Sequence, residues 1–377
     1  MKIGIDAQTL LRTDAGVTYY TKGILSEVLK LDKENFYDLL LFQNPLEKQR
    51  ELFGKGDNRS SRYQKLFPYK LFYKLFKLGL PVPLEVFFGT HDLYFFPDYV
   101  EYPHLTGKSV VVVHDLSFAD VPHLVQPANR KFLERFVPKS LKEADHVIAV
   151  SEFTKGRIKE VYGVVEEKIT VAGPAVDTNV FYPRKEKEKE TVKKKYGIES
   201  SFILFLGSLE PRKNVRSLIE AFSLLKKNKE GLNLVLAGKP TWIKNELEKQ
   251  VRELKLEEKV KFLGYVEEGD RPALLSAAEA FAYPSLYEGF GMPVLEAQGC
   301  GVPVVASNFT SLPEVAGDGA ILVNPNDAGE LADALNRVLS SPQVRKDLIR
   351  KGKKNTKRFT WNNSARKILA VFNSLGK

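Results

Sequence analysis

The sequence predicts an α/β protein of two domains, each built on a parallel β-sheet that helices cover. Short apolar runs rich in Val, Ile and Phe alternate with longer amphipathic segments, which is the pattern of parallel sheets with crossover helices. With 377 residues, 43% of them hydrophobic, the chain is long for one core and suits two. A charge-dense run from Arg184 to Lys195 separates the two series of strands. It indicates a solvated connector and helix start rather than a nucleic-acid-binding tail.

These apolar runs place the strands and the domain boundary. The first domain is predicted to span residues 1–182 and the second residues 183–360. In the second domain, five apolar residues share one face of a helix: Val215, Leu218, Ile219, Phe222 and Leu225. The predicted strands are Lys2–Asp6, Leu39–Phe42, Leu93–Phe96, Val110–Val113 and Val147–Val150, followed by Phe202–Leu206, Leu232–Ala237, Val260–Leu263, Ala280–Tyr283, Val302–Ala306 and Ala320–Val323.

The composition excludes several classes of protein. Cys300 is the single cysteine and the five histidines are scattered, so we expect neither an intramolecular disulfide nor a zinc site. The N-terminal residues lack the pattern of a signal peptide, and no apolar run approaches the roughly 20 residues of a membrane span. We therefore expect a cytoplasmic protein, soluble or peripheral. A net charge of +10 favours polyanionic partners without choosing among nucleic acid, an anionic membrane and phosphorylated small molecules.

The scarcity of Cys and Met beside many Lys and Glu residues resembles the composition of thermophile proteins. A melting temperature in the mesophile range would contradict this interpretation.

The most distinctive polar cluster follows the strand Ala280–Tyr283. In open parallel sheets, ligands bind beyond the carboxyl ends of the strands. There, Gly289 and Gly291 let backbone amides approach a ligand, and Pro293 suits the first position of a helix that ends at Gly299. The carboxylates of Glu288 and Glu296 can accept hydrogen bonds from sugar hydroxyls. For an isolated pair of glutamates, one surface carboxylate and one capping carboxylate would be the better interpretation.

Three further clusters also follow predicted strands. Arg212 and Lys213 come after Gly207 and Ser208, where fixed cations can stabilise negative charge on a ligand; adjacent basic residues elsewhere are usually surface charges. His114 and Asp115 come directly after Val110–Val113, although a lone histidine is more often structural. Gly16 lies in the loop after the first strand, before a helix that continues to about Leu29.

The segment from Glu288 to Glu296, followed by residues 297–305, resembles the two-glutamate signature of the family 4 retaining glycosyltransferases, which have the GT-B fold. The resemblance covers most of the chain. Residues 205–214 are similar to the family's phosphate-binding loop, and residues 172–183 to its interdomain approach. Phe359 to Trp361 is similar to the start of the family's final helix.

This resemblance implies two Rossmann-like domains facing across a deep cleft that closes by a hinge. The second domain would bind a nucleotide-sugar donor and the first an acceptor, with a final helix, 361–377, crossing back onto the first domain. The family's roles would place Glu296 on the donor ribose, Glu288 on the transferred hexose, and Arg212 and Lys213 on the diphosphate. Thr18 stands where the family commonly has a second glycine. The implied donor-binding residues are Gly16, Ser208, Arg212, Lys213, Glu288, Gly289, Phe290, Gly291, Met292, Pro293 and Glu296, and the implied catalytic residues are His114, Glu288, Arg212 and Lys213.

No Asp-x-Asp motif occurs in the sequence, so we expect activity without a divalent metal or another cofactor. The family's reaction is the retaining transfer of a hexose to a hydroxyl of a glycan or lipid-linked acceptor, as in cell-envelope polysaccharide synthesis. Overall similarity favours mannose from GDP-mannose, with UDP-linked donors left open. The alternatives are another GT-B activity, such as a nucleotide-sugar epimerase or a phosphorylase, and a noncatalytic nucleic-acid-binding protein. We find no nucleic-acid-binding module in the sequence.

The segment from Leu66 to Leu78 predicts a basic amphipathic helix. Lys70, Lys74 and Lys77 form one stripe, and Leu71, Phe72, Leu75 and Leu78 occupy the other side. Two interpretations remain open. The helix can bind an anionic membrane surface, or it can pack its apolar side on the first domain.

Overall fold

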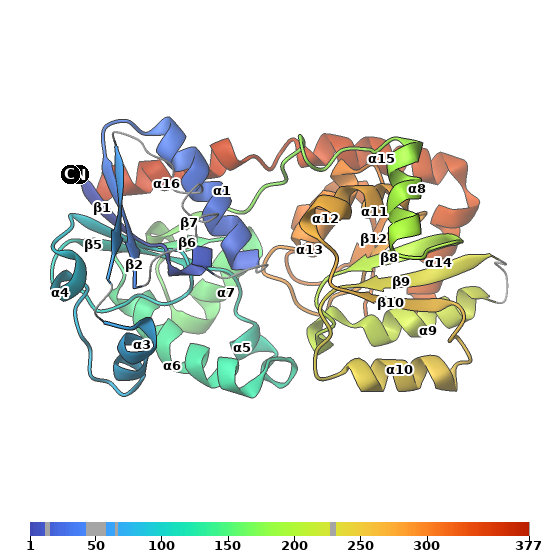
Figure 1. Cartoon of the computed structure of the whole chain (residues 1–377), viewed down its shortest axis with the longest axis horizontal. Coiled ribbons are helices and arrows are strands. Elements are labelled where there is room, and N and C mark those ends of the chain that lie inside the picture. The colour runs from blue at the N-terminus through green and yellow to red at the C-terminus, as the bar shows by residue number, and fades with distance from the viewer. Residues whose placement is uncertain (12–15, 43–57, 65–66, 227–230, 377) are drawn as a thin grey trace. The chain divides into compact units, whose positions relative to one another are not determined.

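The computed structural model describes residues 1–11, 16–42, 58–64, 67–226 and 231–376 (Figure 1). It divides into two compact units. The first comprises residues 1–119, 127–174 and 361–377, and the second comprises residues 120–126 and 175–360. The division falls after Pro174, whereas the sequence analysis placed it after Tyr182. One reason is that buried Phe181 packs on the second unit, where its carbonyl oxygen lies 2.8 Å from the position a Cβ would take at Gly299.

The first unit is built on a sheet of order β3-β2-β1-β4-β5-β6-β7 in which all neighbours pair in parallel. Two of these strands were not predicted. They lie at the two edges of the sheet, where β3 is mostly polar and β7 has three residues. Edge strands bury less surface, so they lack a continuous apolar run. The strands are β1 (Lys2–Asp6), β2 (Phe36–Leu41), β3 (Arg59–Tyr63), β4 (Leu93–Phe96), β5 (Lys108–Val113), β6 (His146–Ala149) and β7 (Ile169–Val171).

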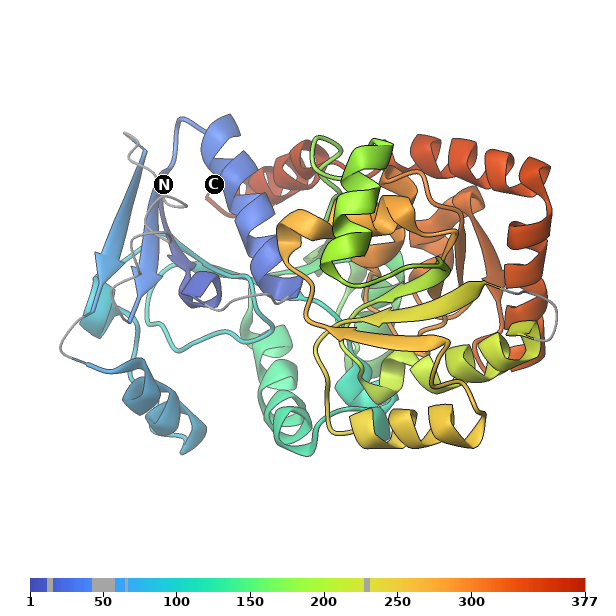
Figure 2. The ribbon, with the colours of Figure 1, turned by 45° about the vertical axis from the view of Figure 1, so that its right-hand side comes forward.

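The final helix of the chain, α16, belongs to the first unit and packs beside α1 (Figures 1 and 2). Gly23 allows this packing, because a Cβ there would lie 2.4 Å from the ring of Trp361. The ring of Tyr19 also contacts Trp361, with centroids 5.6 Å apart. The helices that pack in this unit or reach its boundary are α1 (Gly16–Leu31), α3 (Tyr69–Lys77), α4 (Glu85–Phe88), α5 (Ser117–Asp120), α6 (Pro127–Glu143), α7 (Glu152–Tyr162) and α16 (Trp361–Leu375).

The second unit has a parallel sheet of order β10-β9-β8-β11-β12-β13. The direction of the strand order reverses between β8 and β11, and in such sheets this switch point is where ligands bind. The six strands overlap the six predicted ones: β8 (Ser201–Leu206), β9 (Leu232–Ala237), β10 (Val260–Gly264), β11 (Ala280–Tyr283), β12 (Val304–Ser307) and β13 (Ala320–Val323).

Helices α9 and α10 lie on one face of this second sheet, and α8, α11 and α12 lie on the other (Figure 1). All five apolar residues predicted on one face of α9 are buried, which confirms that prediction. The helices of this unit are α8 (Glu186–Lys195), α9 (Val215–Lys226), α10 (Lys244–Glu253), α11 (Arg271–Ala277), α12 (Met292–Gly299), α13 (Leu312–Ala316), α14 (Ala328–Ser340) and α15 (Pro342–Thr356).

The predicted amphipathic segment forms helix α3, and its buried side agrees with the prediction only in part, at Phe72. Phe72 and Phe76 are buried in the core of the first unit, with Phe76 stacked 4.5 Å from Phe136 of α6. Leu71 and Leu78, predicted on the apolar side, are 42% and 63% exposed. The aromatic side chains offer more area for burial than the leucines, so the helix turns toward them. Leu66 lies outside the described residues.

Among the helices formed by described residues, none combines the length and apolar character that crossing a bilayer requires.

Candidate functional site

Two loops at the carboxyl ends of β8 and β11 meet at the switch point of the second sheet. The first, residues 207–214, leaves β8 and ends at Asn214, whose φ of 54° is left-handed. The second, residues 284–291, leaves β11 and leads into α12. The amide of Leu286 donates to the carbonyl of Arg212 at 2.8 Å, so the two loops are joined by a backbone hydrogen bond. Strand order therefore brings together two segments that lie far apart in the sequence.

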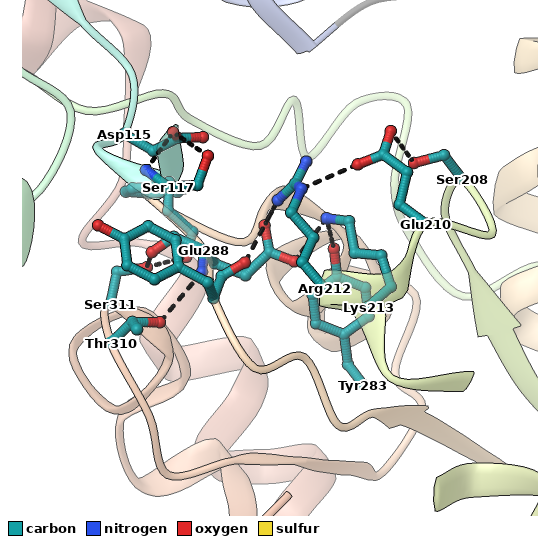
Figure 3. Close-up of polar contacts among 12 residues, drawn as sticks. Asp115, Ser117, Ser208, Glu210, Arg212, Lys213, Tyr283, Glu288, Thr310 and Ser311 are labelled. Atoms are coloured by element: carbon teal, nitrogen blue, oxygen red, sulfur yellow. Dashed lines mark hydrogen bonds and ion pairs between the residues drawn. The ribbon is translucent and has the colours of Figure 1, made fainter. Parts of the chain in front are cut away.

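Glu288 lies at the centre of a charged cluster formed by these loops (Figure 3). Its carboxylate accepts hydrogen bonds from Lys213 Nζ and, at 3.2 Å, from Arg212 Nη1. Lys213 Nζ also donates to the hydroxyl of Tyr283 at 2.8 Å. Both Lys213 and Glu288 are buried, at 7% and 5% exposure. Burying charges this deeply is costly unless they are paired, and here each has an opposite charge as a partner.

The electrostatics of the cluster keep Glu288 ionised. Burial by itself would raise the pKa of Glu288, but the charges of Lys213 and Arg212 hold it at about 2. Burial lowers the pKa of Lys213, as does the neighbouring charge of Arg212, while Glu288 opposes both effects. The site can therefore present two cations to an anion and one carboxylate to a hydroxyl donor.

Glu296 is the fifth of the eight residues of α12 and has a different environment. Its side chain is 6% exposed, and within the part of the chain that the structure describes it forms no hydrogen bond or ion pair. Burial raises its pKa to about 7, although the charge of Arg271 lowers it in part. A buried carboxylate without a partner is costly when it is ionised, which is typical of a group whose partner is a ligand.

The residues that follow β12 hold the glycine loop before α12 in place. Ser311 Oγ donates to the carbonyls of Glu288 and Phe290, at 3.0 and 2.9 Å. Gly291 has a φ of 106°, and a Cβ there would lie 2.5 Å from Leu312 Cδ2, so a side chain at this position would be strained. The first amides of a helix lack acceptors within the helix, so this turn directs donors outward.

The other predicted residues of this segment lie in the loop or in the first turn of α12. Gly289 lies in the loop, and Phe290 packs edge-on against Phe359, with centroids 5.5 Å apart. Met292 is the first residue of α12, so Pro293 is its second residue rather than its first.

His114 follows β5 in the first unit, and its geometry defines its tautomer. Its Nε2 lies 2.8 Å from the carbonyl oxygen of Pro97, which only accepts, so Nε2 carries the proton. Burial lowers the pKa of His114, which favours the neutral ring with a lone pair on Nδ1. The rings of Tyr20 and Tyr99 pack against it, with centroids 5.2 and 5.3 Å away. His114 can therefore accept a hydrogen bond from a hydroxyl.

Asp115 stabilises its own loop, because its Oδ1 accepts from the amide and the hydroxyl of Ser117, at 2.9 and 2.8 Å (Figure 3). Gly16 is the first residue of α1 and is exposed, and a Cβ at this position would meet no atom within 4 Å. Neither its backbone conformation nor its packing requires glycine. The rest of that loop, residues 12–15, lies outside the described residues.

The structure thus groups the predicted residues Ser208, Arg212, Lys213 and Glu288 in one cluster and places Glu296 in the adjoining helix of the same unit. His114 and Gly16 belong to the other unit. Sequence reasoning missed Glu210, whose carboxylate binds both Ser208 and Arg212, and it missed the Tyr283 hydroxyl. The position of Glu210 two residues before Arg212 was an available signal, whereas Tyr283 reads simply as the last residue of a strand. Among the described residues, no three His, Cys, Asp or Glu side chains gather as metal ligands would.

Comparisons with known proteins agree on one family. A family model described as "Glycosyl transferases group 1" matches residues 187–355, and one described as "Glycosyltransferase Family 4" matches residues 57–180. The chain is 33% identical over 275 residues to the O-antigen chain mannosyltransferase B of Escherichia coli, and the alignment covers 72% of each chain. It is 30% identical over 283 residues to the serotype-specific mannosyltransferase WbdA of Escherichia coli, covering 71% of this chain but 34% of that longer protein.

A solved structure of sucrose-phosphate synthase from Thermosynechococcus elongatus is similar over 99% of this chain and 98% of its own, with a TM-score of 0.74 and 19% identity. At this identity the likeness shows a shared fold.

Proposed function

The chain belongs to glycosyltransferase family 4 and has the GT-B fold class, and we propose that this hexosyltransferase moves mannose from GDP-mannose to a hydroxyl of a glycan or lipid-linked acceptor. The pathway would build a cell-envelope polysaccharide or glycolipid. The observation that supports this proposal best is the combination found in the second unit. Paired cations follow β8 and a buried carboxylate without a partner follows its neighbour β11, an arrangement that suits recognition of a diphosphate and a ribose.

The cations have a defined part in the chemistry. When the bond between the hexose and the diphosphate breaks, negative charge develops on the leaving phosphate oxygen. Arg212 and Lys213 would stabilise that charge without reorganising, since their side chains are already held by hydrogen bonds. Glu288 would then accept hydrogen bonds from hydroxyls of the hexose, and Glu296 from the two ribose hydroxyls.

We propose that the neutral ring of His114 accepts a hydrogen bond at Nδ1 from a hydroxyl of the transferred hexose. The proton on Nε2 is held by the carbonyl of Pro97, so Nδ1 is the nitrogen that accepts. Transfer would retain the anomeric configuration by front-face substitution. An NMR spectrum that showed the inverted anomer in the product would overturn this part of the proposal.

Metal independence is also proposed. The cationic pair would supply the charge stabilisation that a divalent ion gives elsewhere. The test is donor turnover in excess EDTA, where unchanged turnover is expected. A loss in EDTA that added Mg²⁺ or Mn²⁺ restores would refute it.

Mannose and guanine are favoured because curated relatives carry the name mannosyltransferase. The experiment is a thermal-shift screen of the purified chain against GDP, UDP, GDP-mannose and UDP-hexoses, followed by turnover with the sugar that stabilises most. A shift with GDP compounds but not with UDP compounds is expected, and the reverse order would replace the proposed donor. Conversion of the donor sugar without any acceptor would instead favour an epimerase.

A membrane contact is proposed for α3 and its neighbours. Leu71, Leu78 and Val86 expose 42%, 63% and 67% of their surface, and Lys70, Lys74 and Lys77 are exposed beside them. Exposed apolar side chains flanked by lysines match an anionic lipid interface, where each lysine contributes about 1 kcal/mol. Flotation of the chain with vesicles containing phosphatidylglycerol at low salt is the test. An absence of binding would refute the contact and would leave the transfer reaction unaffected.

A further inference from the structure

Glu210 is a second carboxylate that binds Arg212 of the cationic pair. It lies in the loop after β8, directly before the short helical turn Pro211–Lys213. One carboxylate oxygen accepts from Arg212 Nε at 2.9 Å, and the other accepts from Ser208 Oγ at 2.9 Å. The charges of Arg212 and Lys213 lower the pKa of Glu210 against the opposing effect of its burial, so this carboxylate is ionised.

The guanidinium of Arg212 is therefore bound at two different nitrogens. Nε donates to Glu210, while Nη1 donates to Glu288 and, at 3.3 Å, to the carbonyl of Tyr287. A guanidinium is planar and rigid, so hydrogen bonds at two of its nitrogens define the orientation of the whole group. If Glu288 turns to hydroxyls of the hexose when the donor binds, the bond from Nη1 to Glu288 is lost, and the bond from Nη1 to the carbonyl of Tyr287 is long. The bond from Nε to Glu210 remains.

The negative charge of Glu210 also makes the binding of an anion at this site less favourable. Together, Glu210 and Glu288 carry as much negative charge as Arg212 and Lys213 carry positive charge, so the cluster is balanced before an anion binds. A carboxylate this close to the cations weakens their attraction for a diphosphate in the ground state. A group that was present to bind the donor tightly would not be a carboxylate.

We propose that Glu210 is a positioning residue that fixes the guanidinium of Arg212 for the transition state at the expense of diphosphate affinity. The inference rests on the proposed function of this site. It predicts that the turnover number and the nucleoside diphosphate affinity change in opposite directions when the carboxylate is removed, which a loss of folded structure would not produce.

The test is Glu210→Gln in the full chain, with kcat and KM for the donor measured beside GDP and UDP binding by calorimetry. We expect kcat to fall at least about tenfold, because Arg212 is no longer oriented. We expect the dissociation constant of the bound nucleoside diphosphate to decrease about threefold to tenfold, because one negative charge is removed. Glu210→Asp should recover part of kcat.

Glu246→Gln is the matched control. Glu246 forms an exposed ion pair with Arg216 of the same unit, at 3.4 Å, so this change removes the same charge away from the loops. It should leave both constants unchanged. An unchanged kcat in Glu210→Gln beside an active wild type, or weaker diphosphate binding together with the lower kcat, would overturn the inference alone. A wild-type chain that binds neither GDP nor UDP would overturn the proposed function and this inference with it.

Discussion

Replacing Glu296 by Gln should make the unliganded protein more stable above pH 7 and at the same time impair nucleotide binding. Burial raises the pKa of Glu296 to about 7 from 4.5, so the folded chain keeps a proton that the unfolded chain releases. Stability contributed by this group is therefore lost as the pH rises from about 4.5 to about 7. A neutral amide of the same shape does not titrate and escapes this loss.

The size of the effect follows from the shift in pKa. At roughly 1.4 kcal/mol per pKa unit, the ionised carboxylate costs at most about 3.5 kcal/mol above pH 7. For a unit of this size, about 3.5 kcal/mol corresponds to an increase in melting temperature of roughly 7–14 °C. At pH 4.5 the variant and the wild type should differ by less than about 0.5 kcal/mol, since Glu296 is then neutral in the folded chain and about half ionised in the unfolded chain.

The same change should weaken nucleotide binding. Hydrogen bonds from the two ribose hydroxyls to a carboxylate are worth about 1.5–3 kcal/mol each, so the variant should bind GDP at least about tenfold more weakly at pH 8. In the wild type, affinity should also decrease as the pH falls below about 7, because the proton competes with the ribose. The variant should not show this pH dependence.

Differential scanning fluorimetry from pH 4.5 to 8.5, with and without GDP, measures both effects. Glu253→Gln is the control, because Glu253 is 63% exposed in its side chain and pairs with Lys249 on the surface of α10. A Glu296→Gln variant that is less stable than the wild type at pH 8 would refute the electrostatic argument. Unchanged GDP affinity with the wild-type pH dependence would refute the ribose assignment.

Three further predictions concern other parts of the molecule. Glu288→Gln should lower the transfer rate about a hundredfold while nucleotide affinity changes much less, as donor kinetics and calorimetry would show; normal turnover would exclude Glu288 from the reaction. Asp38 is buried and paired with Arg62 and His91, which hold its pKa at about 2 against the effect of burial. The contribution of the ionised Asp38 to stability is present above about pH 4 and is lost as the pH falls toward 2. The melting temperature of Asp38→Asn should therefore fall less steeply with pH in this range than that of the wild type. An equal slope would be inconsistent with this account. Gly23→Ala should destabilise the first unit by about 1–3 kcal/mol in a melting assay, because the added Cβ would overlap the ring of Trp361. The control is Gly156→Ala in α7, where a Cβ meets nothing within 4 Å, and this variant should be as stable as the wild type or more stable. Equal effects of the two changes would show that α16 does not pack on α1 as described.

Local patterns in the sequence were sufficient for much of the fold. All eleven predicted strands overlap observed ones, since buried parallel strands are continuous apolar runs, and the face of α9 follows from helical spacing. The two missed strands, β3 and β7, are at the sheet edges, where burial no longer selects apolar residues. The buried side of α3 was predicted only in part. Phe72 is buried as expected, but Leu71 and Leu78 are exposed, because the choice among apolar side chains depends on what the helix packs against.

By itself, the sequence determined which residue types are available near the site: two glutamates around a glycine turn, and two adjacent cations after a strand. The tertiary structure alone decided that Glu288 pairs with Lys213, 75 residues away, because the strand order places β8 beside β11. It also decided that Glu296 is buried without such a partner, which gives two glutamates of one motif pKa values of about 2 and about 7. Charge interactions depend on distance and burial rather than on separation along the chain, and those follow from strand order and helix packing.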